Sequence, residues 1–349
     1  MIKRLLTAAL ACFMTVACAV TCFADNSTED AQTIDHEIDV PQKIVFIGDS
    51  IPAGYGLDGY TKDASEPPKD SYAAILGKKY GAELTGKCPF QMKDLAVSGD
   101  TSSQLKEKIN SGSFDKDIKD SDVVVISIGG NDLMRPMLEF IGTELNIRSL
   151  DDLKGVDPKS FAKPEMLVKM QSVLSTVSDN INAFSENIKS ITDKVHQLTK
   201  GTIIFQTVYN PLDTNNNLAV VSNLVADKLA SLNNAINTGS QNGSNYKICD
   251  ISTAFAGKSN ELTNINSFDI HPNAQGHQVI SQELDKVIRQ SKYHYKEIIK
   301  KEVTSSSDNS TGTGQKVSMS TAFMTLGLFF GGFILLFVIV MVWFKKKQN

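Results

Sequence analysis

Residues 43–50 read Lys43-Ile44-Val45-Phe46-Ile47-Gly48-Asp49-Ser50. The apolar run is short, as is typical of a buried strand. A glycine then allows a sharp turn, and Ser50 follows where the strand ends. In open α/β sheets, ligands bind at the carboxyl ends of the strands, so Ser50 is a candidate nucleophile. Taken alone, the tripeptide is better explained as a strand followed by a serine helix cap.

Strands and helices alternate through the middle of the chain. Short apolar runs predict further strands at 92–97, 122–128, 202–208 and 246–251. Apolar residues spaced three or four apart predict helices at 71–79, 102–109, 167–198, 218–236 and 273–288. This alternation favours the α/β class, with a parallel sheet that is covered by helices on both faces.

The two ends of the chain predict export followed by membrane anchoring. Residues 1–24 have two basic residues, an apolar stretch and a small residue at the end, which is the layout of a signal peptide. Residues 318–344 are nearly all apolar and long enough for a single C-terminal transmembrane helix. Three lysines follow, so the positive-inside rule makes 345–349 a cytoplasmic tail. We therefore expect a single-pass protein of the cell membrane with its folded domain outside the cell.

Between these ends we expect one folded domain over 40–301, flanked by polar segments. Residues 25–39 are acidic and predict a disordered leader, and residues 302–317 are rich in Ser and Thr and predict a flexible stalk. Gly327 and Gly331 form a G-x-x-x-G motif in the predicted membrane helix. This motif either gives a weak homodimer contact or is incidental.

Charge and cysteine content narrow the partners. Of 35 basic residues, five lie in the predicted signal peptide and tail, which leaves 30 against 39 acidic residues and a net charge near −9. That balance argues against nucleic acid or anionic lipid headgroups as main partners. Cys88 and Cys249 survive signal cleavage, but the predicted strands put them near opposite edges of the sheet, so we expect them to be unpaired. No cluster has metal-ligand spacing, so we expect neither a metal nor another cofactor.

Three more candidate residues follow predicted strands or precede a helix. Gly99, after the second strand, is either an ordinary turn glycine or the source of a backbone N–H for an oxyanion. Asn131, in Gly129-Gly130-Asn131-Asp132, either caps a helix or donates its side-chain amide to the same oxyanion. His271, in Asp269-Ile270-His271-Pro272, is a candidate general base that Asp269 would orient.

Together these residues resemble the SGNH, or GDSL, hydrolase family. The four marker residues of that family fall, in its order, on Ser50, Gly99, Asn131 and His271. The resemblance implies a flavodoxin-like three-layer α/β/α sandwich with a five-stranded parallel sheet. It also implies a serine esterase that hydrolyses carboxylic esters through an acyl-enzyme. Its catalytic residues would be Ser50, His271 and Asp269, and its oxyanion hole would use Ser50, Gly99 and Asn131.

One departure from the family pattern concerns the acid. The family places its acid three residues before the histidine, where this chain has Phe268. The nearest carboxylate, Asp269, lies two residues before His271. Either a shortened loop brings Asp269 to the imidazole, or a Ser–His dyad works with a backbone carbonyl as its orienting group.

The sequence is compatible with several substrates and with one rival function. Short acyl esters, lysophospholipids and acetylated glycans all fit an exported esterase. Met134–Pro164 predicts a lid or a pocket wall, but ordinary core packing explains its apolar residues, among them Met134 and Met137, equally well or better. The rival hypothesis is a non-catalytic surface binding module that retains the fold. Such a module would be expected to lack Ser50, Asn131 or His271, and all three are present. His277 we interpret as a surface or packing residue.

Overall fold

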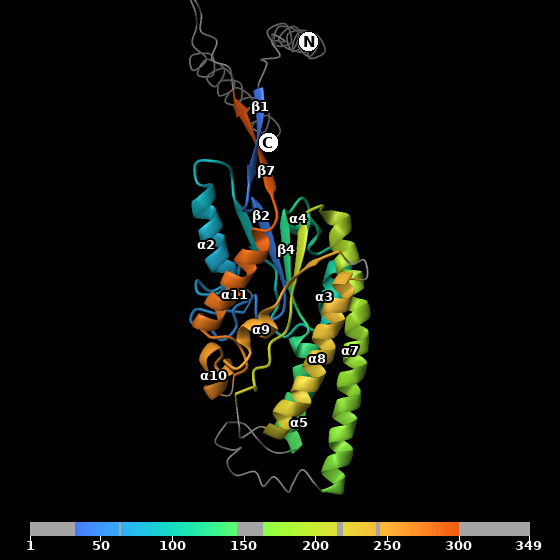
Figure 1. Cartoon of the computed structure of the whole chain (residues 1–349). Helices are drawn as coiled ribbons and strands as arrows, with labels where there is room; N and C mark the ends of the chain where they lie inside the picture. Colours follow the sequence, from blue (N-terminus) through green and yellow to red (C-terminus); the bar gives the residue numbers. More distant parts are fainter. Residues whose placement is uncertain are drawn as a thin grey trace, which may run out of the picture. The chain divides into compact units, whose positions relative to one another are not determined.

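The computed structural model describes residues 32–62, 64–144, 163–214, 219–241, 245–267 and 269–299 (Figure 1). The predicted signal peptide, stalk, transmembrane helix and tail, together with Gly327 and Gly331, lie outside these residues and stay predictions. Among the helices that are described, none combines the length and the apolar character needed to cross a bilayer.

Five parallel strands form the central sheet. They are β2 (Lys43–Gly48), β3 (Gln91–Asp94), β4 (Val123–Ser127), β5 (Thr202–Gln206) and β6 (Lys247–Cys249). Their order across the sheet is β3-β2-β4-β5-β6, which is the flavodoxin-like arrangement. The five predicted strands are confirmed, although the last four end earlier than predicted because loops begin where the ladder of hydrogen bonds stops.

Helices cover both faces of this sheet (Figure 1). One face carries α2 (Tyr72–Leu84), α9 (Ile251–Phe255) and α11 (Ala274–Ile288); the other carries α3 (Ser102–Asn110), α5 (Gly130–Glu144), α7 (Pro164–Leu198) and α8 (Ala219–Gln241). Neighbouring strand residues point to opposite sides: Val125 packs with the first set of helices and Ile126 with the second. The three-layer sandwich is therefore confirmed.

Smaller elements complete the connections. They are α4 (Asp115–Ile118), α10 (Ser259–Leu262) and the 3₁₀ helix η3 (Ile265–Ser267). The predicted helix at 273–288 begins with Asn273 as its N-cap, whose side chain accepts from the Gly276 amide at 3.0 Å. The predicted lid or wall, Met134–Pro164, begins inside α5, while 145–162 lies outside the described residues.

A two-stranded ribbon, separate from the sheet, corrects one prediction. Strand β1 (Gln32–Ile38) pairs antiparallel with β7 (Tyr293–Ile299) along their whole lengths. The predicted disordered leader at 25–39 is therefore wrong over the residues of β1, and the folded domain starts before residue 40. Polar residues of β1 find partners across the ribbon, as His36 stacks on Tyr295 with ring centroids 4.7 Å apart.

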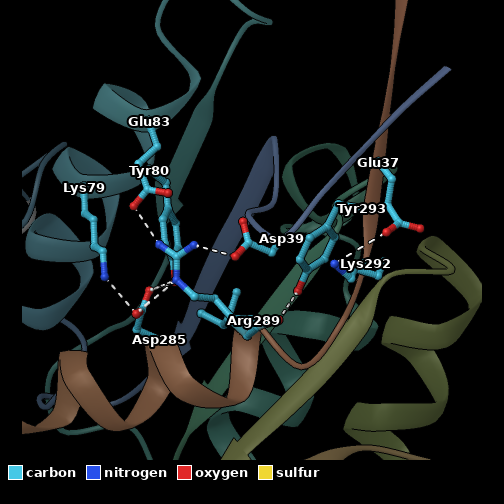
Figure 2. A network of polar contacts seen from close by, with 10 residues as sticks. Glu37, Asp39, Lys79, Tyr80, Glu83, Asp285, Arg289, Lys292 and Tyr293 are labelled. Atoms are coloured by element: carbon cyan, nitrogen blue, oxygen red, sulfur yellow. Dashed lines mark hydrogen bonds and ion pairs between the residues drawn. The ribbon is translucent and has the colours of Figure 1, made fainter. Parts of the chain in front are cut away.

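An ionic network fixes the base of this ribbon (Figure 2). Arg289, the C-cap of α11, donates to Asp39 at 3.0 Å, to Glu83 at 2.6 Å and to Asp285 at 3.1 Å. Lys79 of α2 also donates to Asp285, at 2.8 Å. A single guanidinium thus joins α2, α11 and the segment between β1 and β2.

The two cysteines of the described domain are free thiols, as predicted. Cys249 lies on β6 at one edge of the sheet, and Cys88 precedes β3 at the other. Burial raises the pKa of Cys249 to about 12, so this thiol is unreactive at neutral pH.

Candidate active site

The candidate nucleophile, Ser50, follows a turn that only glycine can make. Gly48 has φ +146°, and a Cβ there would lie 1.9 Å from the carbonyl oxygen of Ser127 on β4. The Asp49 amide donates to that same oxygen at 3.1 Å, and the Asp49 carboxylate accepts from the Ile51 amide at 3.0 Å. These contacts hold Ser50 at the carboxyl end of β2.

The three predicted catalytic side chains come together although the sequence separates them widely. His271 Nε2 lies 2.8 Å from Ser50 Oγ, and Asp269 Oδ1 is hydrogen-bonded to His271 Nδ1. The same carboxylate oxygen accepts from the His271 backbone amide at 3.1 Å. Of the two alternatives for the orienting group, the geometry matches the carboxylate, two residues before the histidine, and not a backbone carbonyl.

The electrostatics of Asp269 follow from this contact. Partial burial alone would raise its pKa, but hydrogen bonds and charge from His271, with a smaller contribution from Asn264, outweigh burial and lower the pKa below its usual value. Asp269 is therefore an anion at neutral pH. An anion at Nδ1 favours the tautomer that leaves Nε2 free to accept a proton from Ser50.

The predicted oxyanion donors follow β2, β3 and β4, which are neighbours in the sheet. Within the described part of the chain, the backbone amides of Ser50 and Gly99 have no hydrogen-bond acceptor. Gly99 has φ +89°, with no atom within 4 Å of the place where a Cβ would lie. Asn131 Nδ2 uses one of its two hydrogens to donate to the Asp100 carbonyl at 2.9 Å, which leaves the other for a ligand.

A buried polar network joins the Gly99 and Asn131 loops. Ser102 donates to the Asp132 carboxylate from its amide at 2.9 Å and from its hydroxyl at 2.6 Å. Asn187 of α7 donates to the Ser102 hydroxyl at 2.9 Å. Asp132 thus supports the turns that carry Gly99 and Asn131. No group of three or more His, Cys, Asp or Glu side chains in the described ranges is placed to hold a metal ion.

His277 is a packing residue, as one of its two interpretations proposed, and it is fully buried in α11. Its Nδ1 accepts from the Tyr72 amide at 3.2 Å, and the two rings stack. Burial, with a smaller effect from His271, lowers its pKa to about 3, so the ring is neutral. It therefore takes no part in proton transfer at neutral pH.

Sequence reasoning missed one residue that contacts the candidate base. The ring of Tyr55 lies 4.5 Å from that of His271, centroid to centroid, and the side chain is still 42% exposed. In the sequence, the one sign of Tyr55 is an aromatic residue five positions after the nucleophile. Tyr55 therefore packs against the imidazole and remains partly open to solvent.

A cavity of about 490 Å³ opens beside Ser50 and His271. Its walls are largely apolar and come from α5, α8 and the loops after β5 and around η3. They include Met134, Met137, Leu212, Val225 and Ile265. Asn131 shares this cavity with Ser50. The predicted pocket wall is therefore confirmed for Met134 and Met137, which also belong to the core.

Comparison with known proteins agrees with this geometry. The model of the GDSL-like Lipase/Acylhydrolase family matches residues 46–279, and the chain belongs to this family of esterases and lipases. The uncharacterized protein YpmR of Bacillus subtilis (strain 168) is 24% identical over 271 residues, which cover 77% of this chain and 90% of YpmR.

Two solved lipases share the fold. The lipase Lip_vut3 from a goat rumen metagenome is 18% identical, with a TM-score of 0.50 over 70% of this chain and 96% of its own. An extracellular lipase from Streptomyces rimosus is 15% identical, with a TM-score of 0.50 over 70% of this chain and 99% of its own. At these identities the likeness concerns the fold alone.

Proposed function

We propose that this protein is an extracellular, membrane-anchored serine esterase that hydrolyses carboxylic esters through an acyl-enzyme. The observation that carries the proposal is the continuous hydrogen-bonded chain from Asp269 through His271 to Ser50, which ends at an open cavity. A base within hydrogen-bond reach of the nucleophile, itself oriented by an acid, is the arrangement that activates a serine hydroxyl.

The reaction begins when His271 takes the proton of Ser50 and the serine oxygen attacks the ester carbonyl. The negative charge of Asp269 stabilises the imidazolium that forms. His271 then protonates the leaving alcohol, and an acyl group remains on Ser50. Water, deprotonated by the same imidazole, releases the acid and restores the free enzyme.

The tetrahedral oxyanion would be bound by the amides of Ser50 and Gly99 and by the side chain of Asn131. Their free donor hydrogens support this role. Each such donor is worth roughly 3–4 kcal/mol in the transition state. Asn131 is held by the Asp100 carbonyl before substrate arrives, so little reorganisation is needed during the reaction.

The cavity supports an ester with an apolar acyl group as the substrate. Its volume of about 490 Å³ falls within the range of small-molecule pockets, about 300–1,000 Å³. Met134 and Met137 on its wall are unbranched and adaptable, which suits acyl chains of several lengths. Among the predicted substrates, short acyl esters and lysophospholipids therefore fit better than acetylated glycans.

The ribbon lies at the other end of the domain from this site. Gln32 and Ile299 pair at its outer end, and β1 leads into β2 at the amino end of the sheet. The site lies at the opposite, carboxyl end of the strands. Ile299, the last residue of β7, thus lies at the end of the domain away from Ser50.

A fluorophosphonate probe tests the proposal on the purified protein. The wild type should be labelled once per chain, and Ser50→Ala should not be labelled. Ser113→Ala is the control, since this serine is exposed and does not line the cavity. A wild type that neither reacts with the probe nor hydrolyses a panel of acyl esters would instead favour the non-catalytic binding module.

A further inference from the structure

We propose that Asn264 is a positioning residue, which holds Asp269 against His271 and so replaces the longer loop that the family uses. This inference rests on the proposed function, because it assigns the support for the acid of that same site. It concerns the shortened spacing of this chain, in which the acid lies two residues before the histidine and not three.

The backbone of Asn264 closes the loop that carries both residues. Its amide donates to the His271 carbonyl at 2.9 Å. Its carbonyl accepts from the Ser267 amide at 2.8 Å and from the Asp269 amide at 3.3 Å. Asn264 is therefore bonded to the acid and to the base at once, on the backbone alone.

The side chain of Asn264 and the free oxygen of the acid both face Gly56. His271 uses Asp269 Oδ1 for both of its hydrogen bonds, which leaves Oδ2. A Cβ built on Gly56 would lie 3.0 Å from Asp269 Oδ2 and 3.0 Å from Asn264 Nδ2. Asp269 Oδ2 and Asn264 Nδ2 thus both lie next to the space that a side chain at position 56 would occupy.

Gly56 completes this support. Its carbonyl accepts from Asn264 Nδ2 at 3.3 Å, and its φ of +86° suits glycine. The loop that follows the nucleophile therefore touches the loop that carries the acid and base. This contact links Ser50 to Asp269 along a second route, independent of the His271 imidazole.

The two-residue spacing between Asp269 and His271 explains why the acid needs a second residue to orient it. Asp269 turns back on its own loop to reach the His271 amide, and the last torsion of an aspartate has a broad energy profile. A carboxylate fixed through one oxygen can rotate away from Nδ1. The Asn264 side chain, on the Oδ2 side of the carboxylate, limits that rotation, and it helps to lower the pKa of Asp269, which favours the charged form of the acid.

The central test replaces Asn264 by Ala and measures ester hydrolysis and fluorophosphonate labelling. We expect kcat and the labelling rate to fall roughly tenfold, as for one lost hydrogen bond to a charged group, while KM is unchanged. The low-field proton NMR signal of His271 Nδ1–H should also shift. Asn266→Ala is the matched control, because this exposed side chain in the same segment donates to the Asn260 carbonyl at 3.3 Å.

A second variant, Asn264→Asp, keeps the side-chain shape but places a carboxylate beside Asp269. Two neighbouring carboxylates stabilise the protonated imidazole, so the acidic limb of kcat/KM against pH should move to higher pH. A merely structural role would lower the melting temperature without moving this limb. The variant also serves if Asn264→Ala does not fold.

The proposal is overturned if Asn264→Ala matches Asn266→Ala in kcat and in the Nδ1–H signal, or if Asn264→Asp leaves the acidic limb in place. Because the NMR signal can be measured without turnover, it tests the positioning role of Asn264 separately from the proposed esterase function. If the wild type proves inactive, the proposed function fails, but a shifted signal in Asn264→Ala still supports the positioning role.

Discussion

At the carboxyl end of the sheet, Asp49 and Asp132 are buried, Asp94 is partly buried, and none of the three forms an ion pair within the described residues. Near the amino end, by contrast, Asp285 accepts hydrogen bonds from Lys79, Tyr80 and Arg289. Burial raises the pKa of Asp49 and of Asp94 to about 7. At Asp285, burial also acts to raise the pKa, but donors from Lys79, Tyr80 and Arg289 outweigh it and lower the pKa.

This difference separates a functional end from a structural end. Buried carboxyl groups around the turns of Ser50 and Asn131 cost stability once they ionise, and they stay because they hold backbone amides near the nucleophile. Near the ribbon, the carboxylates gain stability from cations. Substitutions at the first end should therefore change activity or pH dependence, and those at the second end should change stability alone.

The largest effect is expected for Asp269→Asn. An asparagine keeps the shape but removes the charge that stabilises the imidazolium, so kcat should fall roughly 10³- to 10⁴-fold. Stability should change little, because the side chain is only partly buried. Steady-state kinetics on a short acyl ester measure the loss. Asp285→Asn makes the same chemical change at the other end and should leave kcat unchanged. An equal fall in kcat in both variants would contradict the division into a functional and a structural end.

The next effect concerns Asp49 and pH. A carboxyl group whose pKa is about 7 in the folded protein, against 3.8 for an unperturbed aspartate, stays protonated at pH values where the unfolded chain ionises. Its stability contribution is therefore complete below about pH 4 and is lost as pH rises to about 7. Three pKa units correspond to roughly 4 kcal/mol, an upper bound for this loss.

Asp49→Asn removes this titration and keeps an oxygen for the Ile51 amide. Relative to the wild type, the variant should gain stability between acid and neutral pH, measured as the difference in urea unfolding free energy. Asp285 is the opposite case. The lowered pKa of its carboxyl group gives the wild type stability that is present above about pH 4 and lost at lower pH, and Asp285→Asn should remove this contribution. If the unfolding free energies of the wild type and of Asp49→Asn change in parallel from about pH 4 to about pH 7, the Asp49 carboxyl group does not cause the pH dependence of stability.

At the ribbon end, Arg289→Met is expected to cost about 2 kcal/mol. Three carboxylates lose a shared donor, while the methionine retains much of the apolar stem. The Arg289 side chain is 25% exposed, so solvent reduces the loss. Urea unfolding measures the change. The kcat of the folded variant should equal that of the wild type, and a fall in kcat would mean that the two ends are coupled through α11.

How far the fold could be predicted depended on the range of the contacts. Strand β4 was predictable because its residues are buried on both faces and its composition alone reveals this. Strand β1 was not, because it is polar and its partners lie far away in the chain: the His36–Glu297 contact joins residues 261 positions apart. No local pattern around 32–38 distinguishes such a strand from a disordered leader.

The same division applies to the site. Ser50, Gly99, Asn131 and His271 were predictable from motifs at the ends of strands and the start of a helix. The choice of Asp269 over a backbone carbonyl was not, because it depends on how the loop before α11 turns. Asn264 was missed because its contact with Gly56 joins residues 208 positions apart. Motifs find the groups that react, and only the fold finds the groups that hold them.

The smallest effect is expected within the ribbon itself. His36→Ala removes the ring stacked on Tyr295 and the 2.8 Å contact with Glu297, both at the surface. Exposed pairs of this kind contribute about 0.2–1 kcal/mol, so the urea midpoint and kcat should be unchanged while ribbon amides exchange roughly two- to fivefold faster. Hydrogen exchange read by mass spectrometry resolves this, with Lys292→Ala, at the ribbon base, as the comparison. Unchanged exchange in His36→Ala but faster exchange in Arg289→Met would mean that the ribbon depends on its ionic base, and not on pairs across its strands.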